Sequence, residues 1–123
     1  MKKVYTLILP LLRRSFLFVF LGFTSAANAQ TVSLLAGNAL GTAGMANGIG
    51  SAASFSNPFG VVADGAGNLY VADAINNQIR KIVIATQVVT LLAGNVAGGP
   101  GSTDGTGTAA SFNGPLGLAL DGA

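Results

Sequence analysis

Residues Phe55 to Gly94 read FSNPFGVVADGAGNLYVADAINNQIRKIVIATQVVTLLAG. This stretch contains four short apolar, β-branched runs, at 61–63, 68–72, 78–84 and 88–92. The segments between them, DGAGN, DAINN and ATQ, are typical of tight turns. Four short strands joined by such turns form an antiparallel meander. Because residues 30–123 show no sustained helical period, the sequence predicts an all-β fold.

The turn and strand residues have expected local roles. Asp64 and Asp73 each end a strand, where a carboxylate can accept backbone N–H bonds in the following turn. Gly65, Gly67 and Asn68 suit positive φ. Alternation puts Ile79 on a different face from Arg80 and Ile82, and Val71, Ile79 and Ile82 are expected to fill the space between repeats. Arg80 and Lys81, two charges on one strand, are interpreted as a solvated face.

The pentapeptide LLAGN occurs at Leu34–Asn38 and again at Leu91–Asn95, which shows that the meander belongs to a repeat. Residues 31–66 align with residues 88–123 at an offset of 57 without a gap, with 19 identities in 36 positions. A period of this size indicates a solenoid, a propeller or an array. One four-stranded meander per repeat is the blade of a β-propeller.

The blade resembles an NHL repeat, whose pattern is roughly Pro-x-Gly-hydrophobic-x-hydrophobic-Asp, then Gly-Asn-hydrophobic-Tyr-Val-Ala-Asp, then Asn-x-Arg-Ile-x-Lys-hydrophobic. The positions that fit it are Pro58, Gly60, Asp64, Gly67, Asn68, Tyr70, Val71, Asp73, Asn77, Ile79 and Lys81. Gln78 departs from the pattern, because that family usually has Arg there. The second copy repeats Phe55 and part of the motif as Phe112, Pro115, Gly117 and Asp121. The resemblance implies a β-propeller, commonly six-bladed.

The first 29 residues are predicted to be a signal peptide. They combine a basic beginning, an apolar run from Phe16 to Phe23 and an A-x-A site cleaved between Ala29 and Gln30. A transmembrane anchor is the alternative, but Arg13 and Arg14 interrupt the apolar stretch that a span requires. The paired arginines also resemble a twin-arginine export signal, so the Sec and twin-arginine routes both stay open.

Removal of this segment changes the charge of the protein. The whole chain has a formal net charge of +2, but residues 30–123 keep only Arg80 and Lys81 against four aspartates, which gives 2 − 4 = −2. A mature charge of this sign does not predict nucleic-acid binding, which needs a clustered positive face. The mature chain contains no Cys, His, Trp or Glu, which excludes disulfides and His-ligated zinc from its own residues.

The predicted organisation is a signal peptide (1–29) followed by an NHL-type propeller segment (30–123). The segment divides into a closure strand (31–36), a long loop (39–54), a complete blade (55–93), a second long loop (96–111) and a partial blade (112–123). About 94 residues at a period of 57 make about 1.6 blades, whereas propellers have about four to eight. The sequence therefore suggests the N-terminal part of a longer protein; the alternative is a small protein that completes a ring by self-association.

Three motifs are candidates for chemistry. Gly48–Ala53 and Gly105–Ala110 both fit the dinucleotide fingerprint G-x-G-x-x-A, but neither has the strand before it and the helix after it that the fingerprint needs. Gly98–Gly107 resembles a calcium loop with one carboxylate, too few for the six to eight oxygen ligands of calcium. Phe55 and Phe112 are interpreted as core residues. The sequence thus predicts no metal, cofactor or catalytic residue.

The resulting functional hypothesis is an exported NHL-type propeller module that acts as a binding or interaction scaffold. Its predicted partner is a protein or carbohydrate ligand at the loops 39–54 and 96–111, with the remaining blades required and no membrane contact after signal cleavage. The alternative is the N-terminal part of a metal-dependent propeller enzyme, a lyase or lactone hydrolase, whose catalytic residues lie in other blades. RNA binding, known for some animal NHL proteins, is opposed by the export signal and the mature charge.

Overall fold

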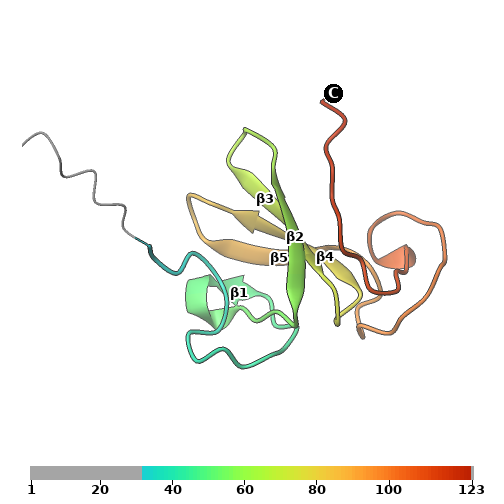
Figure 1. Cartoon of the computed structure of the whole chain (residues 1–123), viewed down its shortest axis with the longest axis horizontal. Coiled ribbons are helices and arrows are strands. Elements are labelled where there is room, and N and C mark those ends of the chain that lie inside the picture. The colour runs from blue at the N-terminus through green and yellow to red at the C-terminus, as the bar shows by residue number, and fades with distance from the viewer. Residues whose placement is uncertain (1–31, 123) are drawn as a thin grey trace, which may run out of the picture. The chain divides into compact units, whose positions relative to one another are not determined.

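The computed structural model describes residues 32–122, and the predicted signal peptide with its cleavage site at Ala29 and Gln30 lies outside them. The described part is a single five-stranded antiparallel sheet (Figure 1). Its strands are β1 (Gly48–Ile49), β2 (Pro58–Ala63), β3 (Asn68–Asp73), β4 (Gln78–Val83) and β5 (Val88–Ala93). The strand order is β1-β5-β4-β3-β2, so β2 to β5 form a meander and β1 adds to its outer edge. The predicted all-β fold class, with one complete four-stranded blade and incomplete flanking parts, is confirmed.

The turn between β2 and β3 is closed by Asp64. Its carboxylate accepts hydrogen bonds from the backbone N–H groups of Ala66 (2.8 Å) and Asn68 (3.0 Å). Gly65 and Gly67 have φ values of 71° and 95°, as predicted. The expectation for Asn68 was wrong: it begins β3 in an extended conformation, and its side-chain amide donates to Asp64 instead. The Asp64 carboxylate and the two glycines after it, Gly65 and Gly67, therefore fix this turn.

The other two turns each end on a non-glycine residue in the left-handed region. Asn77 has a φ of 53° directly before β4, and Gln87 has a φ of 58° directly before β5. Asparagine tolerates this conformation better than most residues, which explains its place in the DAINN turn. These residues set the register in which Asp73 pairs with Gln78 and Val83 pairs with Val88.

The sheet has two faces, which we call face A and face B. The pairs Leu69–Ile82, Val71–Arg80 and Ile82–Val89 place these residues on face A, because directly opposed residues share a face. Face B carries the alternate residues, Val62, Tyr70, Ile79 and Leu92. The predicted separation of Ile79 from Arg80 and Ile82 is therefore confirmed.

Face A holds the core of the described residues. Val71, Ile82 and Val89 are buried there together with Ala53 of the first long loop. Leu35, Ala36, Phe55 and Leu69 pack around this cluster. The segment that precedes the blade therefore covers face A.

The two long loops share a 3-10 turn and lie on opposite sides of the sheet in Figure 1. The first contains β1 and a 3-10 turn (Gly50–Ala52), and the second contains a 3-10 turn (Gly107–Ala109), so neither is wholly irregular. Gly37 donates to Gly50, and 57 residues later Gly94 donates to Gly107, both at 3.1 Å. Each G-x-G-x-x-A motif thus forms a three-residue turn, which is not the helix start of a dinucleotide site.

The flanking segments 32–36 and 112–122 contain no strand. A strand needs a hydrogen-bonded neighbour, and among residues 32–122 neither segment has one in the sheet. The closure strand at 31–36 and the partial blade at 112–123 therefore stay predictions. In the part of the chain that the structure describes, no helix combines the length and apolar character of a membrane span.

Candidate functional site

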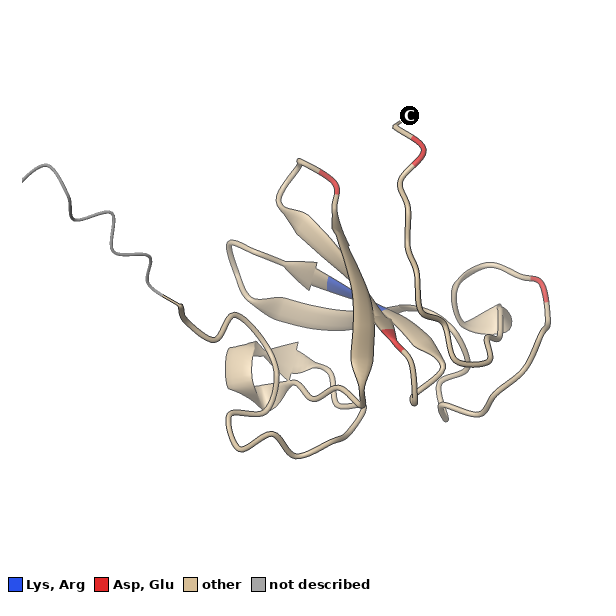
Figure 2. Ribbon diagram, viewed as in Figure 1, with Lys and Arg blue, Asp and Glu red and all other residues tan. Residues whose placement is uncertain are grey.

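A buried ion pair lies at the centre of the blade. Nη1 of Arg80 on β4 is 3.1 Å from Oδ2 of Asp73 on β3, and both side chains have an exposed fraction of 0%. In Figure 2 one blue and one red segment lie on the strands of the sheet, whereas the other red segments lie in a turn, in a loop and near the C-terminus. The interpretation of Arg80 as part of a solvated face was wrong. Arg80 is in phase with the apolar residues of face A, and the loop that covers this face buries it.

The guanidinium of Arg80 binds the first long loop. Nη1 donates to the carbonyl of Ser54 (3.1 Å), and Nη2 donates to the carbonyl of Ala46 (2.9 Å) and to Oδ1 of Asn47 (2.7 Å). Its Cζ lies 5.2 Å from the ring centroid of Phe55, within the range of a cation–π contact. The planar fork of arginine suits this set, because it presents several donors in fixed directions. Arg80 therefore fastens the loop to the blade.

Asp73 completes the network. Its carboxylate accepts hydrogen bonds from the backbone N–H of Ser56 (2.7 Å) and from Nδ2 of Asn76 (2.8 Å). Nδ2 of Asn76 also donates to the carbonyl of Gly44 (2.7 Å). The expectation that Asp73 accepts backbone N–H bonds from the turn after it was wrong, since its backbone donor comes from the segment before β2. Asp73 is a structural residue that joins loop, β3 and β4.

Asp64 and Tyr70 form a second, more exposed cluster. The side chain of Asn68 donates to Asp64 at 2.6 Å, and Tyr70 Oη donates to the same oxygen at 3.1 Å. The side-chain bond from Asn68, followed by the backbone bond from Asn68, lowers the pKa of Asp64 to about 2. Desolvation, followed by the hydrogen bond to Asp64, raises the pKa of Tyr70. These groups are stabilised in their resting protonation states, which fits turn closure better than proton transfer.

Asn77 and Gln78 connect the blade to the second long loop. Asn77 donates to the carbonyl of Gly98 (2.9 Å) and accepts from the backbone N–H of Gly114 (2.8 Å). Gln78, only 2% exposed, donates to the carbonyl of Asn95 (2.8 Å). The residue that departs from the NHL pattern is thus a buried amide that holds the following loop.

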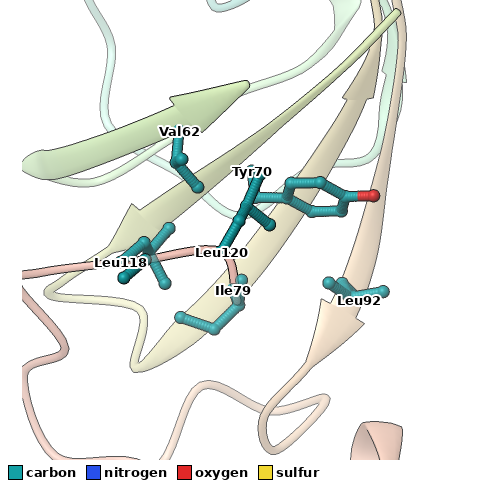
Figure 3. Close-up of a pocket in the computed structure, with 7 residues that line it drawn as sticks. Val62, Tyr70, Ile79, Leu92, Leu118 and Leu120 are labelled. Carbon is teal, nitrogen blue, oxygen red and sulfur yellow. The ribbon is translucent and has the colours of Figure 1, made fainter. Parts of the chain in front are cut away.

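One pocket, of about 210 Å³, lies between face B and the segment 118–120. Figure 3 shows the side chains of Val62, Tyr70, Ile79, Leu92, Leu118 and Leu120 around this space. Leu118 and Leu120 occupy the positions that Val61 and Ala63 occupy on face A of the first copy. The pocket therefore lies between face B of the sheet and the second copy of the repeat, whose Leu118 and Leu120 partly fill it. It lacks the convergent polar groups of a ligand site.

A second hollow, of about 310 Å³, lies beside the first long loop and is lined by Leu34, Gly41, Phe55 and Pro58 among others. At the equivalent place in the second loop, Asn77 bridges Gly98 and Gly114. The hollow thus corresponds to a position that the turn of a preceding repeat occupies in the second copy. Only the first pocket is lined by residues of both copies of the repeat.

The remaining repeat positions also have structural roles. Pro58 begins β2 opposite Asp73. A Cβ atom at Gly60 would clash with the carbonyl of Leu116, so this glycine allows the chain around Gly117 to pass close to β2. Phe112 is half-buried, as is Pro115, whereas Asp121 is exposed. Among residues 32–122, no cluster of three or more His, Cys, Asp or Glu side chains could hold a metal ion.

The fold is similar to that of three solved Bacteroides proteins. A Bacteroides thetaiotaomicron protein of unknown function has a TM-score of 0.64 and 32% sequence identity over 71% of this chain. An auxiliary nutrient binding protein from Bacteroides ovatus has a TM-score of 0.56 and 24% identity over 65% of the chain, which shows the fold alone. An auxiliary nutrient binding protein from Bacteroides thetaiotaomicron has a TM-score of 0.53 and 26% identity over 62% of the chain.

The matching part covers 22%, 21% and 20% of these three proteins, so this chain spans about a fifth of their length. No protein-family model matches the chain, and no curated protein matches it. The NHL resemblance therefore stays a prediction. The comparisons place the fold next to that of nutrient-binding proteins from Bacteroides.

Proposed function

We propose that the mature chain is an exported β-propeller module of the NHL type that acts as part of a binding scaffold. Two of the similar structures are named auxiliary nutrient binding proteins, and this supports a binding role. The ligand proposed for this chain is a nutrient-type carbohydrate or a protein. Because this chain spans about a fifth of the similar proteins, binding by the whole scaffold is proposed to require further blades.

One observation carries the proposal: the two long loops have the same backbone hydrogen bonds but present different side chains at the surface. Their hydrogen bonds recur at an offset of 57: Gly44 donates to Phe55 at 3.1 Å, and Gly101 donates to Phe112 at 2.8 Å. Their outward residues do not recur, because Met45 is replaced by Ser102 in the second copy. A constant framework that presents different side chains is typical of binding loops.

The most exposed large side chains of the loops are the proposed contact residues. Leu40 is 90% exposed in the first loop, and Val96 is 66% exposed in the second. An apolar side chain held in solvent by an ordered loop gains stability when a ligand covers it. Leu40 and Val96 are neighbours in the aligned repeat, at equivalent positions 40 and 39.

The export part of the proposal is tested by fractionation of cells that produce the complete chain. We expect the protein outside the cytoplasm, with an N-terminus at Gln30 by mass spectrometry, and retention in the cytoplasm when residues 1–29 are deleted. Recovery of an intact N-terminus at Met1 in the membrane fraction would contradict cleavage.

The binding part is tested with a glycan array and with a panel of secreted proteins as immobilised probes, followed by calorimetry on any binder. The variants Leu40→Ser and Val96→Ser should each weaken binding about tenfold, in proportion to the apolar area lost from the contact. Ile84→Ser is the matched control, because Ile84 is also exposed but lies in the turn between β4 and β5. Equal affinity of all three variants would rule out the loops as the contact surface.

A further inference from the structure

The second long loop repeats the arginine-binding arrangement of the first. In the first loop the acceptors for Arg80 are the carbonyls of Ala46 and Ser54 and the side chain of Asn47. The residues 57 positions later are Thr103, Ser111 and Asp104. The loop therefore carries the same three kinds of acceptor in the same order.

The acceptors of the second loop are already held by the same hydrogen bonds as the acceptors that bind Arg80 in the first loop. Ser111 donates from its backbone to the carbonyl of Thr103 at 3.0 Å, as Ser54 donates to Ala46 at 3.1 Å. Ser111 Oγ accepts from the backbone of Thr103 at 2.7 Å, as Ser54 Oγ accepts from Ala46 at 3.0 Å. The arrangement is thus formed by the loop itself, before any guanidinium binds.

Charge makes the second loop a stronger acceptor than the first. Asp104 is exposed and stands where the first copy has the neutral Asn47. Within residues 32–122 the ion pair of Arg80 is with Asp73, and no cation contacts Asp104. A carboxylate binds a guanidinium more strongly than an amide does, because both partners are charged and the contact can be bidentate. The half-buried Phe112 follows Ser111 as Phe55 follows Ser54.

The backbone beside this site is also available. In the first copy, Gly48 and Ile49 form β1 and pair with β5 of the blade whose arginine the loop holds. Their equivalents, Gly105 and Thr106, are exposed and are not in a strand. The acceptors and the unpaired backbone of Gly105 and Thr106 therefore suit the same kind of partner, a blade with an arginine on its third strand and a free edge on its fourth.

We propose that the second long loop (96–111) is a binding site for the guanidinium of an arginine on the third strand of a following blade, with Asp104 as its carboxylate partner. Arg80 of a second copy of the chain is a poorer source. It would first have to leave Asp73 and the three acceptors of its own first loop, all of which it contacts within 3.1 Å. The site is an interaction surface and does not depend on the ligand of the proposed scaffold.

The first experiment uses the chain as it is and converts the first loop into the second. Asn47→Asp gives Arg80 the carboxylate of the second loop, with Ala46→Thr added to complete the conversion. We expect the melting temperature to stay equal to that of the wild type or to rise, whereas Asn47→Ala lowers it by about 3 °C or more. If Asn47→Asp lowers the melting temperature as much as Asn47→Ala, the second loop is unsuited to a guanidinium and the proposal is overturned.

The second experiment appends a copy of residues 67–93 directly after Ala123, which continues the repeat in register. Asp104→Ala should lower the melting temperature of this extended chain by about 3 °C or more, and change that of the original chain by less than about 1 °C. The effect should disappear when the copied arginine is replaced by methionine. Asp104→Asn should retain at least half of the stabilisation, because the first copy uses Asn47 at this place.

Thr103→Ala is the matched control in the extended chain. Only the backbone carbonyl of residue 103 is proposed to bind, and the first copy already has Ala46 there, so no change is expected.

An equal effect of Asp104→Ala with and without the copied arginine would overturn the proposal. If the original chain is a dimer by sedimentation and Asp104→Ala makes it monomeric, the arginine comes from a second copy, and the following-blade assignment is wrong. If the appended segment does not fold, the Asn47 variants decide.

Discussion

Replacement of Arg80 by methionine tests whether the Asp73–Arg80 network holds the first long loop on the blade. Methionine keeps much of the length and the apolar stem of arginine but removes the charge and all donors. Asp73 would keep the bonds from Ser56 and Asn76 but would become a buried carboxylate without a cation. Breaking a buried ion pair by removing one partner costs about 3–5 kcal/mol.

The loop side of the network adds little to this cost. The carbonyls of Ala46 and Ser54 and the amide of Asn47 lose their guanidinium donors, although Ala46 and Asn47 are near the surface and water can replace the donors there. We therefore expect a loss of about 3–4 kcal/mol in the free energy of unfolding, and a fall of about 12 °C or more in the melting temperature.

The assay is urea denaturation followed by circular dichroism, with hydrogen exchange at the amides of Gly44 and Ser54 as a local measure of loop attachment. Lys81→Met is the matched control: the same change one residue along β4, at a half-buried position that faces the other side of the sheet, should cost less than about 0.5 kcal/mol. Asp73→Asn combined with Arg80→Met should cost less than Arg80→Met alone, since no charge is then left buried. A loss below about 1 kcal/mol for Arg80→Met would refute the network as the main attachment of the loop.

Three other predictions concern the turns and the contact between repeats. Asn77→Gly keeps the positive φ at this position but removes the bonds to Gly98 and Gly114, so it should cost about 1–2 kcal/mol and speed hydrogen exchange at the amide of Gly114; unchanged exchange would count against this contact. Because the pKa of Asp64 is lowered in the folded protein, its contribution to stability is present above its unfolded value near 3.8 and is lost as the pH falls towards 2; an acid titration of the melting temperature should show this loss, and Asp64→Asn should flatten the curve in that window. Gly60→Ala should displace the backbone of Leu116 and shift the NMR signals of residues 116–120. Gly65→Ala should strain only its own turn, where φ is 71°, and leave those signals in place because nothing lies within 4 Å of its Cβ position.

Local patterns in the sequence were sufficient to predict the blade. The alternation of apolar residues and the Asp-Gly and Asn-rich turns depend on neighbours a few positions away, and the structure has strands at each predicted run. The repeat offset has a counterpart in the backbone, since the identical glycines at 37 and 94 have φ values of 118° and 111°. Backbone conformation that is set by short-range sterics could therefore be predicted directly from the sequence.

The role of Arg80 depended on a contact that the local pattern does not contain. Its partners Ala46, Asn47 and Ser54 lie 26 to 34 positions earlier, in a loop with no secondary-structure signal. The available signal was the alternation of side chains along the strand. Arg80 lies two residues from both Gln78 and Ile82, so its side chain is on the face that the core occupies, whereas Lys81 is on the other face. A charge in phase with buried residues predicts a buried pair, and Asp73 is in the same phase on the neighbouring strand.

The positions of the Arg80 partners in the sequence also bear on the order in which the chain folds. Every partner of its guanidinium lies N-terminal to it, so all of them have already been synthesised when β4 emerges from the ribosome. A loop and the blade after it then fold together as one cooperative unit. The blade can fold before the loop that follows it has been synthesised. A propeller built from such units would fold vectorially, with each newly made blade completing the loop that the ribosome released before it.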